Sequence, residues 1–390
     1  MRTQILNGKI LTPQGWIENG SLLIKDTTIA EVLNHNHRLS TADHVIDAEG
    51  AYVLPGGIDI HVHGGGGRDF METDEEAFLT AIAAHRAHGT TSILPTLSSS
   101  TTEMISDAAA TCDRLMRDPM NGIIGLHLEG PYFNIKMAGG QLPENIRSAD
   151  PKEYVPLIEQ HSSIRRWDAA PELPGSEEFG RYLRSKGIVA AIAHTQAGYE
   201  DVKRAYKAGF NLATHFYNAM TGVHKEGMYR QPGTVESVYL EDGFNVEVIC
   251  DGIHVPPAII NMIHKFKGTH RMALITDALA CAASDSQTAF DPRVIIEEGV
   301  CKLADRSALA GSIATMDRLI RTCVNKAHLP LEEVSRMASE TPARIMGVYD
   351  RKGSIEYGKD ADLMMFDKDL NLTKVVQMGR EVEAVNDTNG

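Results

Sequence analysis

Cysteine is scarce in this chain of 390 residues. An odd number of cysteines without any C-x-x-C spacing argues against a disulfide framework and favours a reducing compartment. We therefore predict a cytoplasmic protein. The five cysteines are Cys112, Cys250, Cys281, Cys301 and Cys323.

Long hydrophobic runs are also missing. Nowhere do 18 apolar residues follow one another, and the N-terminal stretch MRTQILNGKI has the pattern of a strand and a turn. Neither a membrane-spanning helix nor a signal peptide is expected. The content of 43% hydrophobic and 23% charged residues is typical of a globular protein that folds on its own.

Positive charge is in deficit, with 38 Lys and Arg against 52 Asp and Glu and a net charge of -14. Nucleic acids and anionic membranes need a dense basic patch, so neither is an expected partner. Any anionic ligand must be held by a few local groups.

The two chain ends resemble each other, because both alternate short strand patterns with turn residues. QILNGKILT and GSLLIKDTTIAEVL stand near the start, and DADLMMFD and NLTKVVQMGREV near the end. We predict that residues 1–54 and 350–390 form one small β-sandwich domain. Residues 55–349 would then form the catalytic domain.

Between the ends, eight short apolar runs alternate with helical segments, which is the pattern of a parallel α/β sheet with helices outside. One such helix is expected over residues 73–89, where Thr73 and Glu76 form a capping box. The fold class is therefore α/β, as a (β/α)8 TIM barrel. The runs are GIDIHVH, TSILPTL, IIGLHLEG, IRRWDAAPE, IVAAIAHT, FNLATHF, NVEVICDG and RMALITDA.

Seven of these runs end in a side chain that can bind a metal ion or a substrate. Such a barrel gathers the carboxyl ends of its strands at one mouth, where active sites are built, so these side chains should converge. They are His61 and His63, Glu129, Glu172, His194, His215, His254 and Asp277.

The stretch LPGGIDIHVHGGGG carries the first two of them. Side chains alternate between the two faces of a strand, so His61 and His63 point the same way and can coordinate one ion together. The four glycines that follow allow a tight turn close to that ion.

Other residues have plainer interpretations. A second H-x-H pair, His35 and His37, stands in a polar loop and is interpreted as solvated surface. Glu172 can equally well satisfy loop amides. His127 shares a face with Glu129 and is a candidate for supporting a metal ligand.

Four imidazoles and two carboxylates suit Zn²⁺ or Fe²⁺ better than Ca²⁺ or Mg²⁺, which prefer all-oxygen ligands. A metal ion with an open coordination position lowers the pKa of bound water to roughly 7. The ligand set thus favours hydrolysis.

The motifs PGGIDIHVHG, HLEGPY, AHT, THFYNAM, DGIHV, TDA, LAGS and TPAR stand in this order along the chain. In them the chain resembles the amidohydrolase superfamily and, within it, the N-acetylglucosamine-6-phosphate deacetylases. The resemblance extends from NGKILTPQGW to GKDADLMMFD. It implies removal of the acetyl group from the phosphorylated amino sugar, with acetate and glucosamine 6-phosphate as products.

The resemblance also assigns the metal ligands. Glu129, His194 and His215 would form a core site, and His61, His63 and Asp277 a second one that shares Glu129. One or two divalent ions are thus implied, with Zn²⁺ favoured over Fe²⁺. No lysine stands at a strand end, so a carbamylated-lysine bridge is not expected.

For the substrate, the resemblance implies that Arg230 reaches in from the partner subunit of a homodimer. Asn218 and Ala219 would join it at the phosphate, and His254 would hold sugar or phosphate oxygens. The chain departs from many relatives at Gln141, where they carry a histidine that polarises the amide carbonyl. Gln141 can donate a hydrogen bond but cannot act as a cation, which leaves the sugar selectivity open.

In the implied mechanism, Asp277 acts as general base toward water and then protonates the leaving amine. Two rival functions remain open. One is deacetylation of N-acetylgalactosamine 6-phosphate or another N-acyl amino sugar, and the other is a non-catalytic scaffold.

Overall fold

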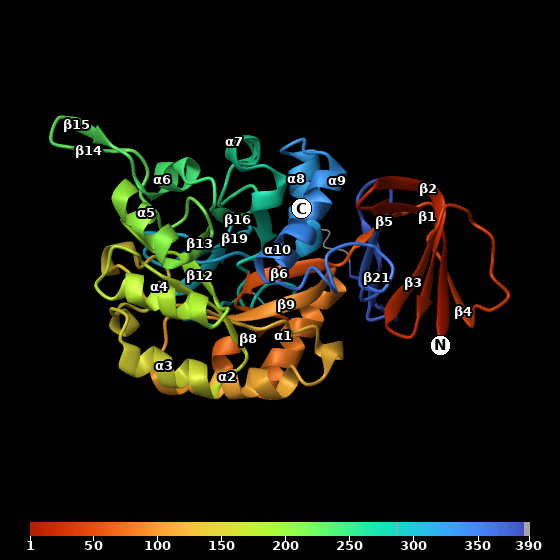
Figure 1. The fold of residues 1–390 in the computed structure, drawn as a ribbon, viewed down its shortest axis with the longest axis horizontal. Coiled ribbons are helices and arrows are strands. Elements are labelled where there is room, and N and C mark those ends of the chain that lie inside the picture. Colours follow the sequence, from red (N-terminus) through yellow and green to blue (C-terminus); the bar gives the residue numbers. More distant parts are fainter. Residues whose placement is uncertain (287, 386–390) are drawn as a thin grey trace.

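The computed structural model describes residues 1–286 and 288–385. A barrel wrapped by helices makes up most of the molecule, and a separate sheet lies at one side of it (Figure 1). The N-terminus belongs to that sheet.

Eight parallel strands form the barrel, in the spatial order β17-β16-β13-β12-β11-β10-β9-β6. The first and last strands are linked by a hydrogen bond of 2.9 Å from the backbone N–H of Asp277 to the carbonyl of His61. The predicted TIM barrel is confirmed. The strands are β6 (Gly57–Val62), β9 (Thr90–Leu97), β10 (Leu126–Tyr132), β11 (Ile164–Ala169), β12 (Val189–Ile192), β13 (Phe210–Ala213), β16 (Asn245–Ile249) and β17 (Met272–Ile275).

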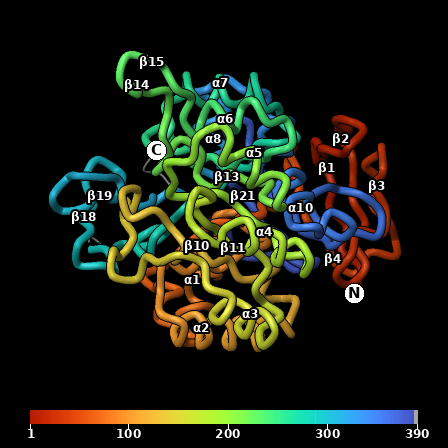
Figure 2. The backbone as a smooth tube through the Cα atoms, turned by 60° about the vertical axis from the view of Figure 1, so that its left-hand side comes forward, coloured from red at the N-terminus to blue at the C-terminus, as the bar shows by residue number. Residues whose placement is uncertain are grey.

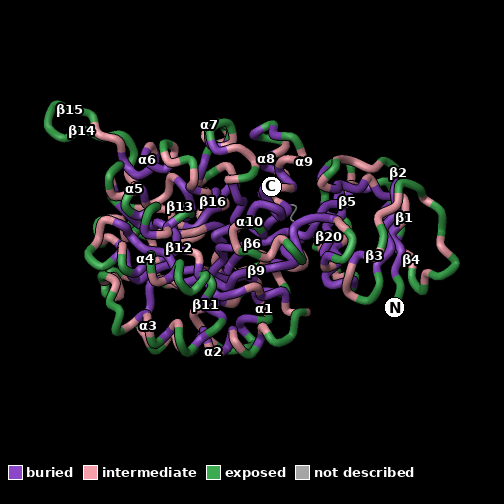
Figure 3. Tube along the Cα trace, in the orientation of Figure 1, coloured by how far each residue is buried: buried purple, intermediate pink, exposed green. Residues whose placement is uncertain are grey.

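A helix follows each strand and covers the barrel from outside. Figure 3 shows the strands buried and the outer helix faces exposed, as expected for a parallel sheet covered on its outer face. The helices are α1 (Glu75–Ala87), α2 (Thr102–Leu115), α3 (Pro151–Gln160), α4 (Ser176–Ser185), α5 (Tyr199–Ala208), α6 (Thr234–Leu240), α7 (Pro257–Lys267) and α8 (Met316–Asn325), with α9 (Leu331–Ala338) and α10 (Glu340–Ile345) after the last strand.

The capping box predicted at Thr73 and Glu76 is wrong. Asp74 caps α1, because its carboxylate accepts a hydrogen bond from the backbone N–H of Ala77. Thr73 instead ends a short 3-10 helix, η1 (Phe70–Glu72), with a left-handed φ of 62°.

The strands of the two chain ends join in one sheet, in the order β22-β21-β20-β5-β1-β2-β3 with β4 beside β1. We propose residues 1–54 and 350–390 as the accessory domain and 55–349 as the catalytic domain; residues 386–390 lie outside the described part. The strands are β1 (Arg2–Thr12), β2 (Gly15–Lys25), β3 (Thr28–Leu33), β4 (His44–Asp47), β5 (Tyr52–Pro55), β20 (Leu363–Phe366), β21 (Leu372–Gln377) and β22 (Arg380–Val382).

Strand β20 has no polar residue because both of its faces are buried. Met364 and Phe366 belong to the large core shared with the barrel. Leu363 and Met365 belong to the core on the other side of the terminal sheet. Successive side chains of a strand point to opposite faces, so every second residue of β20 packs against the barrel and holds the sheet to it.

Three strand pairs extend the barrel loops. The pair β14 (His224–Glu226) and β15 (Tyr229–Gln231) projects from the barrel in both the ribbon and the tube view (Figures 1 and 2). The other pairs are β7 (Gly64–Gly65) with β8 (Arg68–Asp69), and β18 (Val294–Glu297) with β19 (Val300–Leu303). Among the described helices, none has the length and hydrophobicity to cross a membrane.

Candidate metal centre and active site

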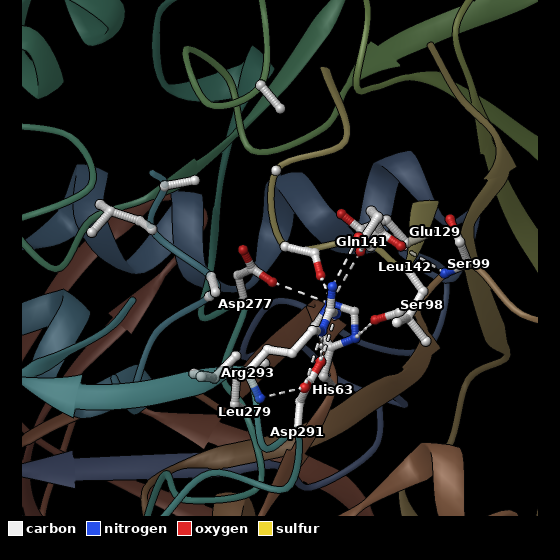
Figure 4. A pocket seen from close by; sticks show the side chains of 18 of the residues that line it. His63, Ser98, Ser99, Glu129, Gln141, Leu142, Asp277, Leu279, Asp291 and Arg293 are labelled. Atoms are coloured by element: carbon white, nitrogen blue, oxygen red, sulfur yellow. Dashed lines mark hydrogen bonds and ion pairs between the residues drawn. The ribbon is translucent and has the colours of Figure 1, made fainter. Parts of the chain in front are cut away.

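A cavity of about 860 Å³ opens at the carboxyl ends of the barrel strands. Its size lies in the range of about 300–1,000 Å³ that is common for small-molecule sites. Figure 4 shows His63, Glu129, Gln141 and Asp277 gathered around it. Of the predicted site residues, those in its lining are His63, Glu129, Gln141, His194, His215, Asn218, Ala219, His254 and Asp277.

Glu129 is the centre of the buried ligand cluster. Its Oε1 lies 3.1 Å from His194 Nε2 and 2.9 Å from His215 Nε2. The two imidazole Nε2 atoms are themselves 3.2 Å apart. These three residues form one of two groups that could hold a metal ion.

The second group shares Glu129. His61 Nε2 and His63 Nε2 are 3.3 Å apart, and Glu129 Oε2 lies 3.3 Å from His63. Asp277 Oδ1 lies 3.3 Å from His61 and 3.2 Å from His63. All six predicted metal ligands therefore meet. Glu129 Oε2 faces His63, whereas Oε1 faces His194 and His215 and lies 3.7 Å from His61.

The other ring nitrogens of the histidines face away from the centre. When Nδ1 carries the proton and donates it outward, Nε2 keeps a lone pair that points to the centre. There these lone pairs face one another and the carboxylates, and a bound cation would stabilise this arrangement. The donor set, four imidazoles and two carboxylates, fits a borderline metal ion. The Nδ1 partners are Met137 O for His194 at 2.8 Å, Asn218 O for His215 at 3.1 Å and Ser98 Oγ for His63 at 3.3 Å.

The histidines around the two carboxylates stabilise the ionised form of each. Burial alone would raise the pKa of Glu129, but the charge of His61 and hydrogen bonds from the other histidines hold it well below its usual value. Burial likewise opposes ionisation of Asp277, yet His61 and His63 lower its pKa to about 2. Both carboxylates are thus ionised at neutral pH.

Local backbone geometry aims three of the ligands. His194, His215 and Asp277 have φ values of 45°, 29° and 48°, in a region that non-glycine residues rarely adopt. Each such residue costs about 1–3 kcal/mol, and such residues cluster at functional sites. Here each one follows a barrel strand and turns its side chain toward the cavity.

The glycines after His63 act as the sequence predicted. Gly66 and Gly67 have φ values of 62° and 87°, which form the tight turn between β7 and β8. Gly64 has no room for a side chain, because a Cβ atom there would lie 2.4 Å from the Arg68 carbonyl oxygen.

Gln141 is buried in the cavity wall and holds Glu129. Its side-chain N–H donates to Glu129 Oε2 across 2.7 Å, and its side-chain oxygen accepts from the backbone N–H of Ser99 across 2.7 Å. Arg293, labelled in Figure 4, also holds this loop, because its guanidinium donates to the carbonyl of Gly140 at 2.9 Å.

His254 faces the cavity with one unpaired nitrogen. Its Nδ1 lies 2.7 Å from Asp251 Oδ2, while its Nε2 is buried without a hydrogen-bond partner among the described residues. Asp251 was not predicted from the sequence, although its place three residues before His254 in DGIH is a signal for such a pair.

Arg230 is the one predicted substrate residue that lies elsewhere. It stands on β15, is exposed and does not line the cavity of its own chain. Glu172 serves the loops, since it accepts hydrogen bonds from Asn134 Nδ2 and the backbone N–H of Gln196. His35 and His37 are exposed, as predicted.

Three buried charged residues beneath the centre were not predicted from the sequence, namely Arg166, Asp168 and Glu247. Charged residues inside the apolar runs IRRWDA and NVEVI were the available signal. His127, a predicted supporting residue, contacts this group through Asp168 at 2.9 Å.

Known proteins resemble the chain over nearly its whole length. N-acetylglucosamine-6-phosphate deacetylase of Bacillus subtilis is 31% identical over 377 residues, 95% of this chain and 94% of that protein. N-acetylgalactosamine-6-phosphate deacetylase of Escherichia coli O157:H7 is 32% identical over 389 residues, 97% and 99% of the two chains. The crystal structure of N-acetylglucosamine-6-phosphate deacetylase from Pasteurella multocida superposes with a TM-score of 0.92, at 28% identity and coverage of 98% and 100%.

The sequence pattern of the Amidohydrolase family matches residues 52–385, which include the barrel and every predicted ligand. The chain therefore belongs to the amidohydrolase family.

Proposed function

We propose that this protein hydrolyses the acetamide of N-acetylglucosamine 6-phosphate to acetate and glucosamine 6-phosphate. The observation that carries the proposal is the convergence of four imidazole Nε2 atoms on Glu129 and Asp277 at the wall of the cavity. Full-length similarity to deacetylases of this sugar supports the choice of substrate.

We propose that these ligands hold one or two divalent ions, Zn²⁺ before Fe²⁺. When bound, such an ion polarises the amide carbonyl and makes a nearby water more acidic. The core ion would be held by Glu129, His194 and His215. The second would be held by His61 and His63 together with Glu129 and Asp277.

Asp277 is the proposed proton carrier. It is ionised at neutral pH, because the neighbouring histidines lower its pKa to about 2, so it can accept a proton from the attacking water. The water oxygen bonds to the carbonyl carbon, the carbon–nitrogen bond breaks, and Asp277 returns the proton to the leaving amine. Both products are then complete.

Recognition of the sugar phosphate is assigned to the rim of the cavity. The free Nε2 of His254 suits a sugar or phosphate oxygen, and Asn218 and Ala219 also line the cavity. We propose that Arg230 completes the phosphate site from the partner subunit of a homodimer. Its place on a projecting, exposed strand pair supports this role.

All five cysteines carry free thiols and are buried, which supports the proposed cytoplasmic location.

N-acetylgalactosamine 6-phosphate is the second candidate substrate. The deacetylase of that epimer from Escherichia coli O157:H7 is as similar to this chain as the Bacillus subtilis enzyme is. Gln141, where many relatives carry a histidine, is the residue that leaves the choice between the epimers open.

The test is acetate release from both epimers and from the two unphosphorylated sugars, with protein assayed for zinc and iron. We expect fast release that needs the 6-phosphate and is faster for the gluco epimer. Absence of release from metal-loaded protein would overturn the proposed substrate, while faster release from the galacto epimer would favour the second candidate.

A further inference from the structure

Three charged side chains lie in the barrel interior beneath the ligand cluster. Arg166 and Asp168 come from β11 and Glu247 from β16, and each is fully buried. Arg166 donates to both oxygens of Asp168 at 3.0 Å and to both oxygens of Glu247, at 2.9 Å for Nη2 and Oε2. One cation is thus shared by two anions.

Arg166 has no donor to spare. Its remaining contacts are with the carbonyl of Ile60 at 3.0 Å and Thr214 Oγ1 at 2.9 Å. A fully bonded guanidinium is rigid, because five N–H groups point in fixed directions. Glu247 is therefore held in one place by an anchor that spans three strands.

Arg166, Asp168 and Glu247 together carry one more negative charge than positive, and both carboxylates face histidines. Glu247 is the member that faces a proposed metal ligand, and both of its carboxylate oxygens accept hydrogen bonds from Arg166. Its Oε2 lies 3.5 Å from His61 Nδ1. That Nδ1 is buried and makes no hydrogen bond of standard geometry among the described residues.

His61 differs in this respect from the other three ligand histidines. Their Nδ1 atoms face backbone carbonyls or a hydroxyl group, which are uncharged acceptors. The Nδ1 of His61 instead faces an anion, while its Nε2 lies within 3.3 Å of both His63 and Asp277. A carboxylate behind a ligand histidine fixes its tautomer and makes its metal-binding nitrogen more basic.

We infer that Glu247, anchored by Arg166, is a positioning residue for His61: it holds the proton on Nδ1 and directs Nε2 into the second metal site. The inference rests on the metal site proposed above. Asp168 contacts the same arginine but faces His127, which is not a proposed ligand. The two carboxylates therefore have separable roles.

The test compares Glu247→Gln with Asp168→Asn, since each removes one carboxylate from Arg166 and only the first faces His61. Zinc is titrated into metal-free protein against a chelator, and the melting temperature of each metal-free variant is measured. The inference requires that wild type bind two zinc ions, and wild type that binds only one overturns it. In Glu247→Gln the weaker-bound ion should lose about 10–100-fold in affinity, and Asp168→Asn should keep wild-type affinity.

A merely structural role would lower the melting temperature of both variants and affect zinc binding equally, and that result overturns the inference. Should Glu247→Gln not fold, Glu247→Asp keeps the charge on Arg166 but withdraws it from His61, and wild-type zinc affinity in that variant overturns the inference too. Wild-type protein that binds no zinc would instead overturn the metal site itself.

Discussion

Gln141 donates to Glu129 Oε2 across 2.7 Å, and the same oxygen lies 3.3 Å from His63 Nε2. The other end of the same amide accepts from the Ser99 backbone N–H. The side chain therefore supports the shared carboxylate, and both ends of its amide have partners before any substrate enters.

Replacing Gln141 by leucine should impair both stability and turnover. Leucine leaves the Ser99 N–H and Glu129 Oε2 without their partner, at about 1–3 kcal/mol per buried group. Gln141→His is the matched control, because it keeps a donor for Glu129 and should retain more activity. Urea unfolding and kcat/KM measure the two effects; a leucine variant equal to wild type in both would contradict this role.

Asp277→Asn should abolish most turnover without emptying the metal site. Proton transfer by a positioned side chain contributes about 10²–10⁴-fold, and asparagine cannot carry the proton. Five other ligands remain, so most bound zinc should be kept. Steady-state kinetics and metal content are measured on the same sample, and unimpaired turnover would remove Asp277 from its role.

Arg230 and Asp277 allow a complementation test of the shared site. If Arg230 acts in the neighbouring subunit, mixing Arg230→Ala chains with Asp277→Asn chains creates one intact site in each mixed dimer. Activity should rise to about a quarter of wild type, since half of randomly formed dimers are mixed and one of their two sites is complete. If the arginine acts within its own chain, mixing restores nothing.

Lys267 should make stability rise with pH in the alkaline range. Burial, and next the charge of Arg271, lowers the pKa of Lys267 to about 8, against about 10.4 in the unfolded chain. Between these values the unfolded state binds more protons, so unfolding becomes less favourable as pH rises. Below pH 8 both states are protonated and this gain is absent.

The measurement is the free energy of unfolding of wild type relative to Lys267→Met at pH 7.5 and pH 10. The difference should shift in favour of wild type at the higher pH. Lys265→Met, an exposed position in the same helix, is the control and should show no such change. A pH-independent difference at position 267 would contradict the prediction.

The barrel was predictable because its strands are buried on both faces and so appear as apolar runs, and seven of the eight runs end in a polar residue. Position alone brought His61, His194 and Asp277 together, since parallel strands end at one mouth. Position at a strand end also distinguished His61 and His63, as candidate metal ligands, from the loop residues His35 and His37.

Contacts that depend on loop conformation could not be predicted from the sequence. The hydrogen bond from the Ser99 backbone N–H to the side-chain oxygen of Gln141 joins residues 42 positions apart, and no periodicity encodes it. At the start of α1, Thr73 and Asp74 are both residue types that favour the N-cap position. Thr73 is already the C-cap of η1, so Asp74 caps α1. The buried Arg166 was passed over because charge is rare inside a barrel strand.

The terminal sheet has a consequence for how the chain is made. Strand β5 pairs with β20, so Pro55 needs Leu363 as its partner. A ribosome adds about 5–20 residues each second, so β20 emerges roughly 15–60 s after β5. Until then the β5 edge and the apolar face of the first strands are open, and an unpaired edge invites association with other chains. The barrel can fold during this interval, but the sheet beside it closes only when synthesis is nearly complete.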